Sequence, residues 1–588
     1  MRILNYTSSC LKVIFTINRE FKLEISSLKL KGFRNFKDSN INFNSNTLII
    51  GCNDVGKSNL LHSLRMILDK SLSEAEIEPN ELDFHLENGT SCEEIEIIIH
   101  FKKINEDAVI SILKGYVSDS GETYIKYTAR RADLSYRLFI GDSLDSFHEI
   151  PSRFYLKFVN LKYIQSQRDL NKFIRKEKKQ LLKIAQQSLN SEERKEDEDL
   201  LAEISLYLKD LNDKVAQLIY VDRATKDINE ELKKLAYQYK EYSVQLDTGA
   251  IGINEFIDSL QLGASTNGSN VMLGGDGRNN QILLALWKAK SIKEYDVENE
   301  VIFYVVEEPE AHLHPHQQRK LANYLITELP GQTIISSHSP QIAVNFKPDS
   351  VIRLLEKSGS TIAASDGCSK VIADDWEGMS YRMSILPAES FFSSGVLLVE
   401  GPSEVLFYHA LADSLDIDLD YYNISIISVE GISFKVYAAI LDALNIPWVM
   451  RTDNDINKLK GKEEWDFAGI NRCLSLAGLD KFKHSNIKIT PEETICNGNW
   501  QTVSEEVNKK GIYLSKVDLE TDLIEELSDL ILSALNKTDN LTAIAYLQKK
   551  KALRMRLLLK KIKNDLKTLQ SGELIKPLLN LKNVIEGA

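Results

Sequence analysis

The stretch Val396–Glu404, VLLVEGPSE, decides the fold of the second half of the chain. Its first four residues are apolar and are bounded by polar sequence, which indicates a buried strand that ends at Glu400. The Gly-Pro-Ser that follows makes a sharp turn, and Glu404 then falls in the first turn of a helix. Because open α/β sheets hold their ligands at the carboxyl ends of the strands, we expect both carboxylates at such an edge.

The stretch Trp448–Asp455, WVMRTDND, repeats this pattern downstream. An apolar strand ends in Asp453 and Asp455, and residues two apart in an extended chain face the same side. Together with Glu400 and Glu404 they place four acids at one sheet edge, which predicts a site for a hard divalent cation such as Mg²⁺. The plainer interpretation is that these acids are only surface charge.

A third acidic element follows the short apolar stretch Ile512–Leu514. Asp518 and Glu520 come after it and can complete a second metal site, so that two Mg²⁺ (or Mn²⁺) stabilise both oxygens of a displaced phosphodiester. The three lysines at 549–551 offer a positive charge for the phosphorus centre. The residues alone leave open which lysine acts, and the plainer interpretation is a basic helix that contacts phosphates.

The first half of the chain carries a phosphate-binding loop. Gly51–Ser58, GCNDVGKS, matches GxxxxGK[ST] in full, with the apolar strand Thr47–Ile50 before it and the helix Asn59–Leu68 after it. Such a loop turns backbone N–H groups toward phosphates, while Lys57 reaches the β and γ phosphates and Ser58 ligates Mg²⁺. We predict an ATP site that includes Asn53, Asp54, Val55, Gly56, Lys57, Ser58 and Asn59.

Two further strands support this ATP site. The apolar strand Val301–Val306 ends in Glu307 and Glu308, where the first acid holds Mg²⁺ through water and the second orients the attacking water. The strand Thr333–Ser337 leads to His338, which we expect to sense the γ-phosphate. A lone histidine there would more often be a buried structural residue, but two preceding ATPase strands favour the switch.

A Gly-rich turn at Met272–Gln281, which includes Gly275, opens an apolar helix and forms a second anion site. This arrangement resembles the ABC-type ATPases, whose signature helix caps the nucleotide of the other subunit; the resemblance implies a homodimer. An ordinary hinge loop is the alternative.

Gln165 or Gln167 can fill the Q-loop of that family. The amphipathic segment at about 170–250 is read as an oligomerisation arm, with plain helical packing as the alternative.

Composition sets limits on partners and location. The net charge of −13 gives no general attraction to nucleic acid, so any contact with DNA must come from local basic patches. The six cysteines are scattered without a CxxC pair, which fits the cytoplasm and argues against a zinc site. No apolar run approaches the ~20 residues that a membrane span needs, so we expect no membrane partner.

The order E-G-x-x-E, a strand at Ile424–Gly431 that ends in glycine, and then D-x-D resembles the Toprim fold. An ABC-type ATPase joined to a Toprim domain is similar to the OLD family of nucleases, and within it to the Gabija type of anti-phage endonuclease. The supporting stretches include LKGFRNF, VVEEPEAHLHP, SSHSP, IYLSKVDLETDL and YLQKKK. The resemblance implies defence against phage, a homotetramer, a UvrD-like helicase subunit as partner, and cleavage restrained by bound nucleotide. It also places the catalytic lysine at Lys551, beside Glu400 and Asp518.

The predicted fold class is α/β, with an ABC-type ATPase domain and its helical insertion followed by a Toprim domain. The predicted boundaries are a disordered extension at 1–22, the ATPase domain at 23–385, the Toprim domain at 386–560 and a C-terminal tail at 561–588. We expect the chain to be helical to about Lys567 and less regular after it. Two departures from the family stand out. The N-terminal extension has no counterpart there, and Glu307 stands where many ABC ATPases have Asp, which leaves open whether ATP is hydrolysed or only sensed.

Two functions from different classes compete. The first is a Mg²⁺-dependent endonuclease that cleaves double-stranded DNA and is regulated by ATP binding. The second is an ATP-driven DNA-repair ATPase of the RecF/SMC type without nuclease activity, which the full set of acids and Lys551 disfavours. A topoisomerase-like strand passer would need a tyrosine nucleophile on a DNA-binding domain, and no segment offers such a domain.

Overall fold

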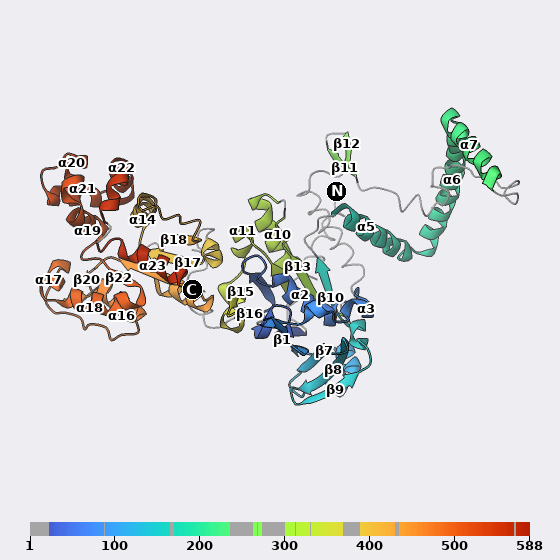
Figure 1. Ribbon diagram of the computed structural model, residues 1–588, viewed down its shortest axis with the longest axis horizontal. Coiled ribbons are helices and arrows are strands. Elements are labelled where there is room, and N and C mark those ends of the chain that lie inside the picture. Colours follow the sequence, from blue (N-terminus) through green and yellow to red (C-terminus); the bar gives the residue numbers. More distant parts are fainter. Residues whose placement is uncertain are drawn as a thin grey trace, which may run out of the picture. The chain divides into compact units, whose positions relative to one another are not determined.

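The computed structural model separates the chain into two compact units (Figure 1). The larger comprises residues 1–165, 298–310 and 315–588, and the smaller comprises 166–297 and 311–314. The predicted extension at 1–22, Gln165, Gln167 and Gly275 lie outside the described residues. The structure describes residues 23–87, 89–164, 170–235, 263–266, 269–272, 300–311, 313–329, 331–368, 388–429, 434–569 and 572–587.

A six-stranded sheet carries the phosphate-binding loop. Its first five strands run parallel and only the last pair is antiparallel, which matches the buried apolar strands that the sequence predicts around the loop. The strand order is β10 (Val159–Ile164), β13 (Val301–Glu307), β14 (Thr333–Ser336), β3 (Asn46–Ile50), β15 (Val351–Lys357) and β16 (Ser360–Ala363).

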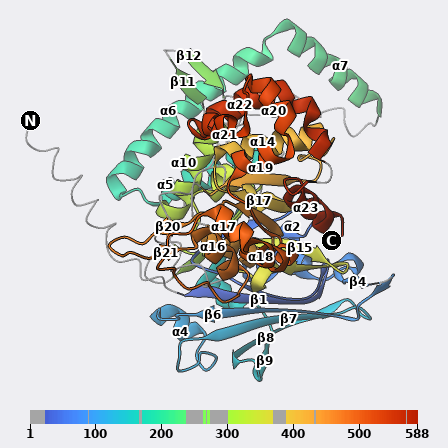
Figure 2. The same cartoon turned by 90° about the vertical axis from the view of Figure 1, so that its left-hand side faces the viewer.

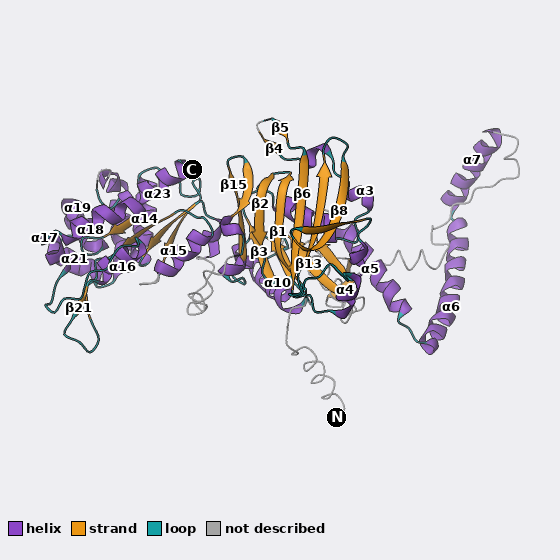
Figure 3. Ribbon diagram, turned by 90° about the horizontal axis from the view of Figure 1, so that it is seen from below, coloured by secondary structure: helices purple, strands orange, loops and turns teal. Residues whose placement is uncertain are grey.

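A second six-stranded sheet is antiparallel throughout (Figure 3). Helix α2 (Lys57–Leu68) buries Leu60, Leu61 and Leu64 in one core with strands of both sheets, so the helix that follows the loop is fixed by hydrophobic packing. The strand order is β2 (Phe36–Asn42), β1 (Glu24–Phe33), β6 (Glu94–Lys102), β7 (Thr123–Arg130), β8 (Ser135–Ser143) and β9 (Ser146–Ile150). Shorter elements of this half are α3 (Glu74–Ile77), η1 (Glu81–Asp83), β4 (Leu86–Glu87), β5 (Thr90–Ser91), α4 (Asp107–Ile112), η2 (Phe154–Lys157), α10 (Pro315–Glu328), α11 (Pro340–Ala343), η4 (Pro348–Ser350) and η5 (Ala364–Asp366).

The acidic stretches lie on a separate four-stranded parallel sheet, here called the C-terminal sheet. Its order is β18 (Ile424–Ser428), β17 (Gly395–Val399), β19 (Trp448–Thr452) and β22 (Ile512–Leu514), so the three strands that lead to acids are neighbours. Figure 2 faces this half of the chain. Around the sheet lie η8 (Ser390–Phe392), α14 (Pro402–Ser414), α15 (Phe434–Ala443), β20 (Asn457–Lys458), β21 (Trp465–Asp466), α16 (Ala468–Leu476), α17 (Pro491–Cys496), α18 (Asn499–Val507), η9 (Asn508–Lys510), α19 (Leu519–Glu526), α20 (Ser528–Leu535), α21 (Asn540–Gln548), α22 (Lys551–Ile562) and η10 (Lys563–Leu569).

The end of the chain differs from the sequence-based expectation of a less regular tail. Helix α23 (Lys576–Glu586) buries Leu578 and Leu581 in the same core as α14, and Asn580 Nδ2 donates to Tyr513 Oη at 2.7 Å. Pro577 lies in the first turn, where a helix tolerates proline because that N–H has no intrahelical partner. The last described residues therefore belong to the core around the C-terminal sheet.

The smaller unit confirms the predicted helical insertion. It contains α5 (Leu170–Gln187), α6 (Ser191–Ala216) and α7 (Ile219–Leu235), together with the hairpin β11 (Gly263–Thr266) and β12 (Ser269–Met272). The charged residues 192–199 form the start of α6, where Asn190 and Glu193 make a capping box. Across the described part of the chain, every helix falls short of the length and apolarity needed to cross a membrane.

Candidate functional sites

The phosphate-binding loop is held in shape by its own lysine and by an asparagine from outside it. Lys57 Nζ donates to the carbonyls of Gly51 at 3.0 Å and Cys52 at 2.8 Å. Gly56 has φ of 105°, and a Cβ there would lie 1.9 Å from Asn35 Nδ2, so only glycine fits. Burial lowers the pKa of Lys57, against the attraction of Glu308 and other nearby acids.

The other predicted loop residues divide into two groups. Asn53 and Asp54 are exposed at the tip, and Asp54 has φ of 62°. Val55 and Asn59 face the protein: the Val55 carbonyl accepts from Asn35 Nδ2 at 2.7 Å, and Asn59 Nδ2 donates to Asn35 Oδ1 at 2.8 Å. Asn35 therefore braces the second half of the loop and the start of α2, a role that the sequence pattern did not reveal.

Glu307 lies at the carboxyl end of β13, beside the loop. Ser58 Oγ donates to Glu307 Oε1, and the Tyr163 hydroxyl donates to Glu307 Oε2. This places the serine and the acid that we predicted for Mg²⁺ in direct contact. Tyr163 was not predicted, although it lies two residues before Gln165, a candidate for the Q-loop. Burial raises the pKa of Tyr163, and its bond to Glu307 raises that pKa further.

Glu308 and His338 meet at the neighbouring strand ends. His338 Nε2 lies 3.3 Å from Glu308 Oε1, and Glu308 N donates to the Ser336 carbonyl at 2.9 Å. Burial lowers the pKa of His338, and the positive charge of Lys57 lowers it further, although Glu308 opposes the shift. A neutral histidine is therefore favoured at pH 7, beside the acid expected to orient water.

Glu400 is the centre of the acidic cluster on the C-terminal sheet. Its Oε1 accepts from Thr452 Oγ1, from the backbone N–H of Asp453 at 3.1 Å, and from Arg472 Nη1. Arg472 Nη2 also donates to Asp455 Oδ2 at 3.2 Å. The ends of β17 and β19 are thus joined through one carboxylate and one guanidinium, as expected when parallel strands end at a common edge.

Lys551 connects the second pair of acids. Its Nζ lies 3.6 Å from Asp453 Oδ2 and 3.8 Å from Glu520 Oε2, so it links the end of β19 to α19. Burial alone would lower the pKa of Lys551, but Asp453, Glu520 and Asp518 outweigh it and raise the pKa. Among the described residues, Lys551 is the one of the three adjacent lysines with ion pairs to these acids, and its catalytic role stays a prediction.

Burial raises the pKa of four of the six predicted ligand acids, which are Glu404, Asp453, Asp455 and Glu520. Burial raises the pKa of Glu404 and raises that of Asp453 well above its ordinary value, with Glu400 adding to both shifts. Burial raises the pKa of Glu520 to about 7; Lys551 opposes this shift, while Asp518 and Glu404 add to it. Such strongly perturbed carboxylates are characteristic of functional sites.

Asp518 sits at the N-terminus of α19. Its Oδ1 accepts from the backbone N–H of Thr521 at 2.8 Å, which caps the helix, and its Oδ2 accepts from Gln548 Nε2 at 2.7 Å. Sequence reasoning missed Gln548, Thr452 and Arg472. No local pattern around Arg472 indicated that it contacts these acids.

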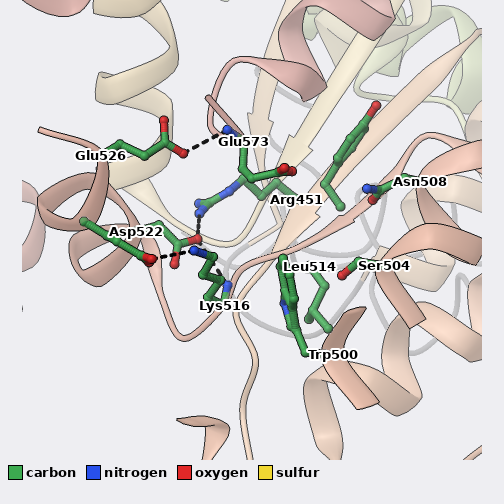
Figure 4. Close-up of a pocket in the computed structure, with 11 residues that line it drawn as sticks. Arg451, Trp500, Ser504, Asn508, Leu514, Lys516, Asp522, Glu526 and Glu573 are labelled. Carbon is green, nitrogen blue, oxygen red and sulfur yellow. Dashed lines mark hydrogen bonds and ion pairs between the residues drawn. The ribbon is translucent and has the colours of Figure 1, made fainter. Parts of the chain in front are cut away.

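A buried ion pair lies next to this cluster (Figure 4). Arg451 Nη2 donates to Asp522 Oδ2 at 2.7 Å, and both side chains are over 90% buried. The pair ties β19, which leads to Asp453, to α19, which carries Glu520. Arg451 Nη1 and Asp522 Oδ1 have no hydrogen-bond partner among the described residues, and they line a pocket with Trp500, Ser504 and Glu526.

The chemistry of the cluster suits a hard divalent ion. Its donors are carboxylate oxygens, and both oxygens of Glu520 are buried without a hydrogen-bond partner among the described residues. Within the described ranges, no three acids, histidines or cysteines are gathered closely enough to enclose one ion, and Arg472 and Lys551 lie between the acids. An ion would therefore have to draw oxygens away from these two cations.

Comparison with known families defines the class of protein. The family described as "AAA ATPase domain" matches residues 23–149 and 122–343, more than half of the chain, so the chain belongs to this family. The family described as "Overcoming lysogenization defect protein-like, TOPRIM domain" matches residues 391–455, which contain the ends of β17 and β19. The predicted fold class, an ATPase domain followed by a Toprim domain, is confirmed.

One relative matches over nearly its full length. "Endonuclease GajA" of Bacillus cereus (strain VD045) is 26% identical over 563 residues, covering 91% of this chain and 94% of that protein. "Uncharacterized protein YbjD" of Escherichia coli (strain K12) is 26% identical over 151 residues, covering 26% of this chain and 27% of that protein. These matches confirm the predicted resemblance to OLD-family nucleases similar to GajA, and the prediction of an endonuclease that carries a nucleotide-binding domain.

A solved structure resembles part of the chain. It is the Smc head domain with an extended coiled coil bound to the C-terminal domain of ScpA, from Pyrococcus furiosus. The match has a TM-score of 0.36 and 19% identity, and covers 58% of this chain and 96% of that chain.

Proposed function

We propose that this protein is a DNA endonuclease of an anti-phage defence system, dependent on Mg²⁺ or Mn²⁺ and regulated by ATP. The observation that carries the proposal is the linked set of acids at the edge of the C-terminal sheet, with Lys551 between Asp453 and Glu520. Double-stranded DNA is the proposed substrate, and the similarity to a protein named endonuclease GajA supports it.

The acids divide between two proposed ion sites. Glu400, Glu404, Asp453 and Asp455 would hold one ion, and Asp518 and Glu520 would hold the second. When bound, such ions supply Lewis acidity to the scissile phosphate and lower the pKa of an attacking water.

The residues of the chain have separate tasks in this proposal. The Lys551 ammonium, held by the carboxylates, stabilises negative charge on the phosphate as the bond breaks. Glu520, whose pKa burial raises to about 7, must lose its proton before it can hold an ion. Lys549, Lys550 and Arg556 are exposed around the start of α22 and offer positive charge to the DNA backbone.

ATP binding at the phosphate loop is proposed to control cleavage. Lys57, Ser58 and Glu307 form the phosphate and ion side of that site, and Glu308 and His338 form the side that senses the γ-phosphate. The contact between Ser58 and Glu307 brings together the two groups that a Mg²⁺–ATP complex requires. We propose further that bound nucleotide restrains the nuclease.

The smaller unit supports the proposed oligomer. Helices α6 and α7 expose large apolar side chains, among them Leu206, Tyr207, Ile219 and Tyr220, each about 70% exposed. A contact with another protein would cover these side chains. We propose a homodimer or homotetramer through the ATPase part of the chain, together with a UvrD-like helicase subunit. We also propose a cytoplasmic location, since all five cysteines in the described ranges are free thiols.

Cleavage of plasmid DNA tests the proposal. Purified protein is incubated with supercoiled plasmid and Mg²⁺, with and without ATP, and compared with Glu400→Gln. We expect nicked and linear products only with a divalent ion, less product with ATP, and none from Glu400→Gln. DNA-stimulated ATP hydrolysis without any cleavage would instead support a repair ATPase and contradict the endonuclease.

A further inference from the structure

Arg472 contacts residues that the proposed metal site uses. Its guanidinium donates from Nη1 to Glu400 Oε1 and Thr452 Oγ1, and from Nη2 to Asp455 Oδ2 at 3.2 Å. The side chain is only 10% exposed, with its guanidinium carbon 5.8 Å from the centre of the Phe434 ring. One cation thus holds two carboxylates that come from the ends of two neighbouring strands.

The position of Arg472 is fixed by its helix rather than by the acids alone. Gly469 lies against the backbone of Asp453, since a Cβ there would be 2.3 Å from that carbonyl oxygen, and its N–H donates to the Asp455 carbonyl at 2.9 Å. Asn471 anchors the other side, where its Nδ2 donates to the Phe482 carbonyl at 3.1 Å and its Oδ1 accepts from Phe482 N at 2.7 Å. Helix α16 therefore delivers the guanidinium to the acidic edge in a set orientation.

Arg451, which is buried on strand β19, provides a contrast. Arg451 pairs with Asp522, which is not among the proposed ligands, so that pair can persist whatever binds at the cluster. Arg472 has ion pairs with Glu400 and Asp455, both of them proposed ligands. A divalent ion that takes oxygens from these two acids would stand within a few ångströms of a guanidinium, and like charges at that distance repel even with partial screening.

We propose that Arg472 is a positioning residue that holds Glu400 and Asp455 together and must release them to the divalent ion, so that it sets the ion concentration at which the site fills. This inference rests on the proposed metal site. Without the guanidinium the two carboxylates would repel each other, and with it the ion must compete for their oxygens. Arg472 therefore holds the two carboxylates in place before an ion binds, and in doing so it weakens the binding of that ion.

Mn²⁺ titration of the full-length protein, followed by the electron paramagnetic resonance signal of free Mn²⁺, measures this competition without any cleavage. Nucleotide and DNA are left out, so that the phosphate loop does not contribute a Mn²⁺–ATP site. We expect Arg472→Met to bind Mn²⁺ at the acidic cluster about tenfold more tightly than the wild type, because one opposing charge is removed. Arg472→Gln is a second neutral variant, and it keeps a hydrogen-bond donor for Glu400.

Two matched variants isolate the cause. Arg472→Lys keeps the charge but loses the fork that spans two carboxylates, and we expect its Mn²⁺ affinity to stay within about threefold of the wild type. Lys488→Met removes one positive charge from an exposed side chain of the same region, and we expect no change. An equal gain in affinity for Lys488→Met would mean that net charge alone acts, and it would overturn the proposal.

Thermal unfolding shows whether Arg472 positions the two carboxylates for an ion or only stabilises the fold. For Arg472→Met we expect a lower Tm than the wild type without ions and a larger rise in Tm on saturation with Mn²⁺, because the ion replaces the missing positive charge. A residue that only braces the fold would lower the Tm equally in both conditions, which would contradict the proposal.

The outcomes separate this inference from the proposed function. If Mn²⁺ binds the wild type, is lost in Glu400→Gln, and binds Arg472→Met and Arg472→Gln no more tightly than the wild type, the role of Arg472 is wrong while the metal site stands. If binding to the wild type is undiminished in Glu400→Gln, the metal site itself is wrong and the inference falls with it.

Discussion

The phosphate loop and the acidic cluster are built in opposite ways. The residues around Lys57 come from one contiguous stretch, and the loop is held by its own backbone and by Asn35. The acidic cluster draws on the ends of β17 and β19, on α16, on α19 and on the start of α22, which together span 152 positions from Glu400 to Lys551 inclusive. The first site depends on backbone shape, while the second depends on cations that hold distant acids together.

This contrast predicts that a single substitution in the acidic cluster lowers DNA cleavage and leaves ATP binding unchanged. Lys551→Met removes the charge between Asp453 and Glu520, and loss of such a stabilising group typically costs about a thousandfold in rate. We expect plasmid cleavage to fall by about that factor while binding of a fluorescent ATP analogue stays unchanged. Unchanged cleavage would remove Lys551 from the site. Lys488→Met is the control, since it removes one positive charge from an exposed side chain that has no part in the proposed site.

The buried Arg451–Asp522 pair should matter for stability. Arg451→Met leaves the Asp522 carboxylate buried without its partner, which costs about 3 kcal/mol or more in the free energy of unfolding. The double variant Arg451→Met, Asp522→Leu replaces both charges and should regain most of that loss. Urea unfolding measures both; a double variant as unstable as the single one would show that the charges themselves are needed.

A substitution in the phosphate loop should weaken ATP binding and leave Mn²⁺ binding at the acidic cluster unchanged. Lys57→Ala removes the loop's ammonium, and since a hydrogen bond to a charged group contributes up to about 3 kcal/mol, we expect ATP affinity to fall by about a hundredfold. Mn²⁺ binding at the cluster, measured without nucleotide, should stay the same. A parallel loss of Mn²⁺ binding would contradict the separation of the two sites.

Protons should compete with Mn²⁺ for the acidic cluster, and the resulting change in Mn²⁺ affinity is the smallest effect predicted here. Burial raises the pKa of Glu520 to about 7, so this carboxyl is protonated below that pH and ionised above it. Because an ion needs the ionised form, the apparent Mn²⁺ affinity should fall by up to about tenfold for each pH unit below 7 and level off above it. Titrations from pH 5.5 to 8 test this, and Glu520→Gln should flatten the profile; a flat profile for the wild type would exclude Glu520 as a ligand.

How far the sequence could predict each site follows from the same contrast. The loop was recognisable because its chemistry lies within Gly51–Ser58, and Glu400 and Asp453 were recognisable because buried strands end beside them. The roles of Arg472 and Arg451 could not be predicted, because a local sequence pattern does not show which cation will pair with an acid that is distant in the sequence. The helix at the end of the chain was also not predicted, because its apolar residues are buried only by packing in the core around the C-terminal sheet.

Diffraction from crystals soaked in Mn²⁺ tests the central claim most directly, because anomalous scattering locates the ion without reference to activity. The account predicts one anomalous peak among Glu400, Glu404, Asp453 and Asp455 and a second beside Asp518 and Glu520, with the Arg472 guanidinium moved off at least one carboxylate. An absence of peaks at these acids in crystals that show Mn²⁺ bound elsewhere would contradict it.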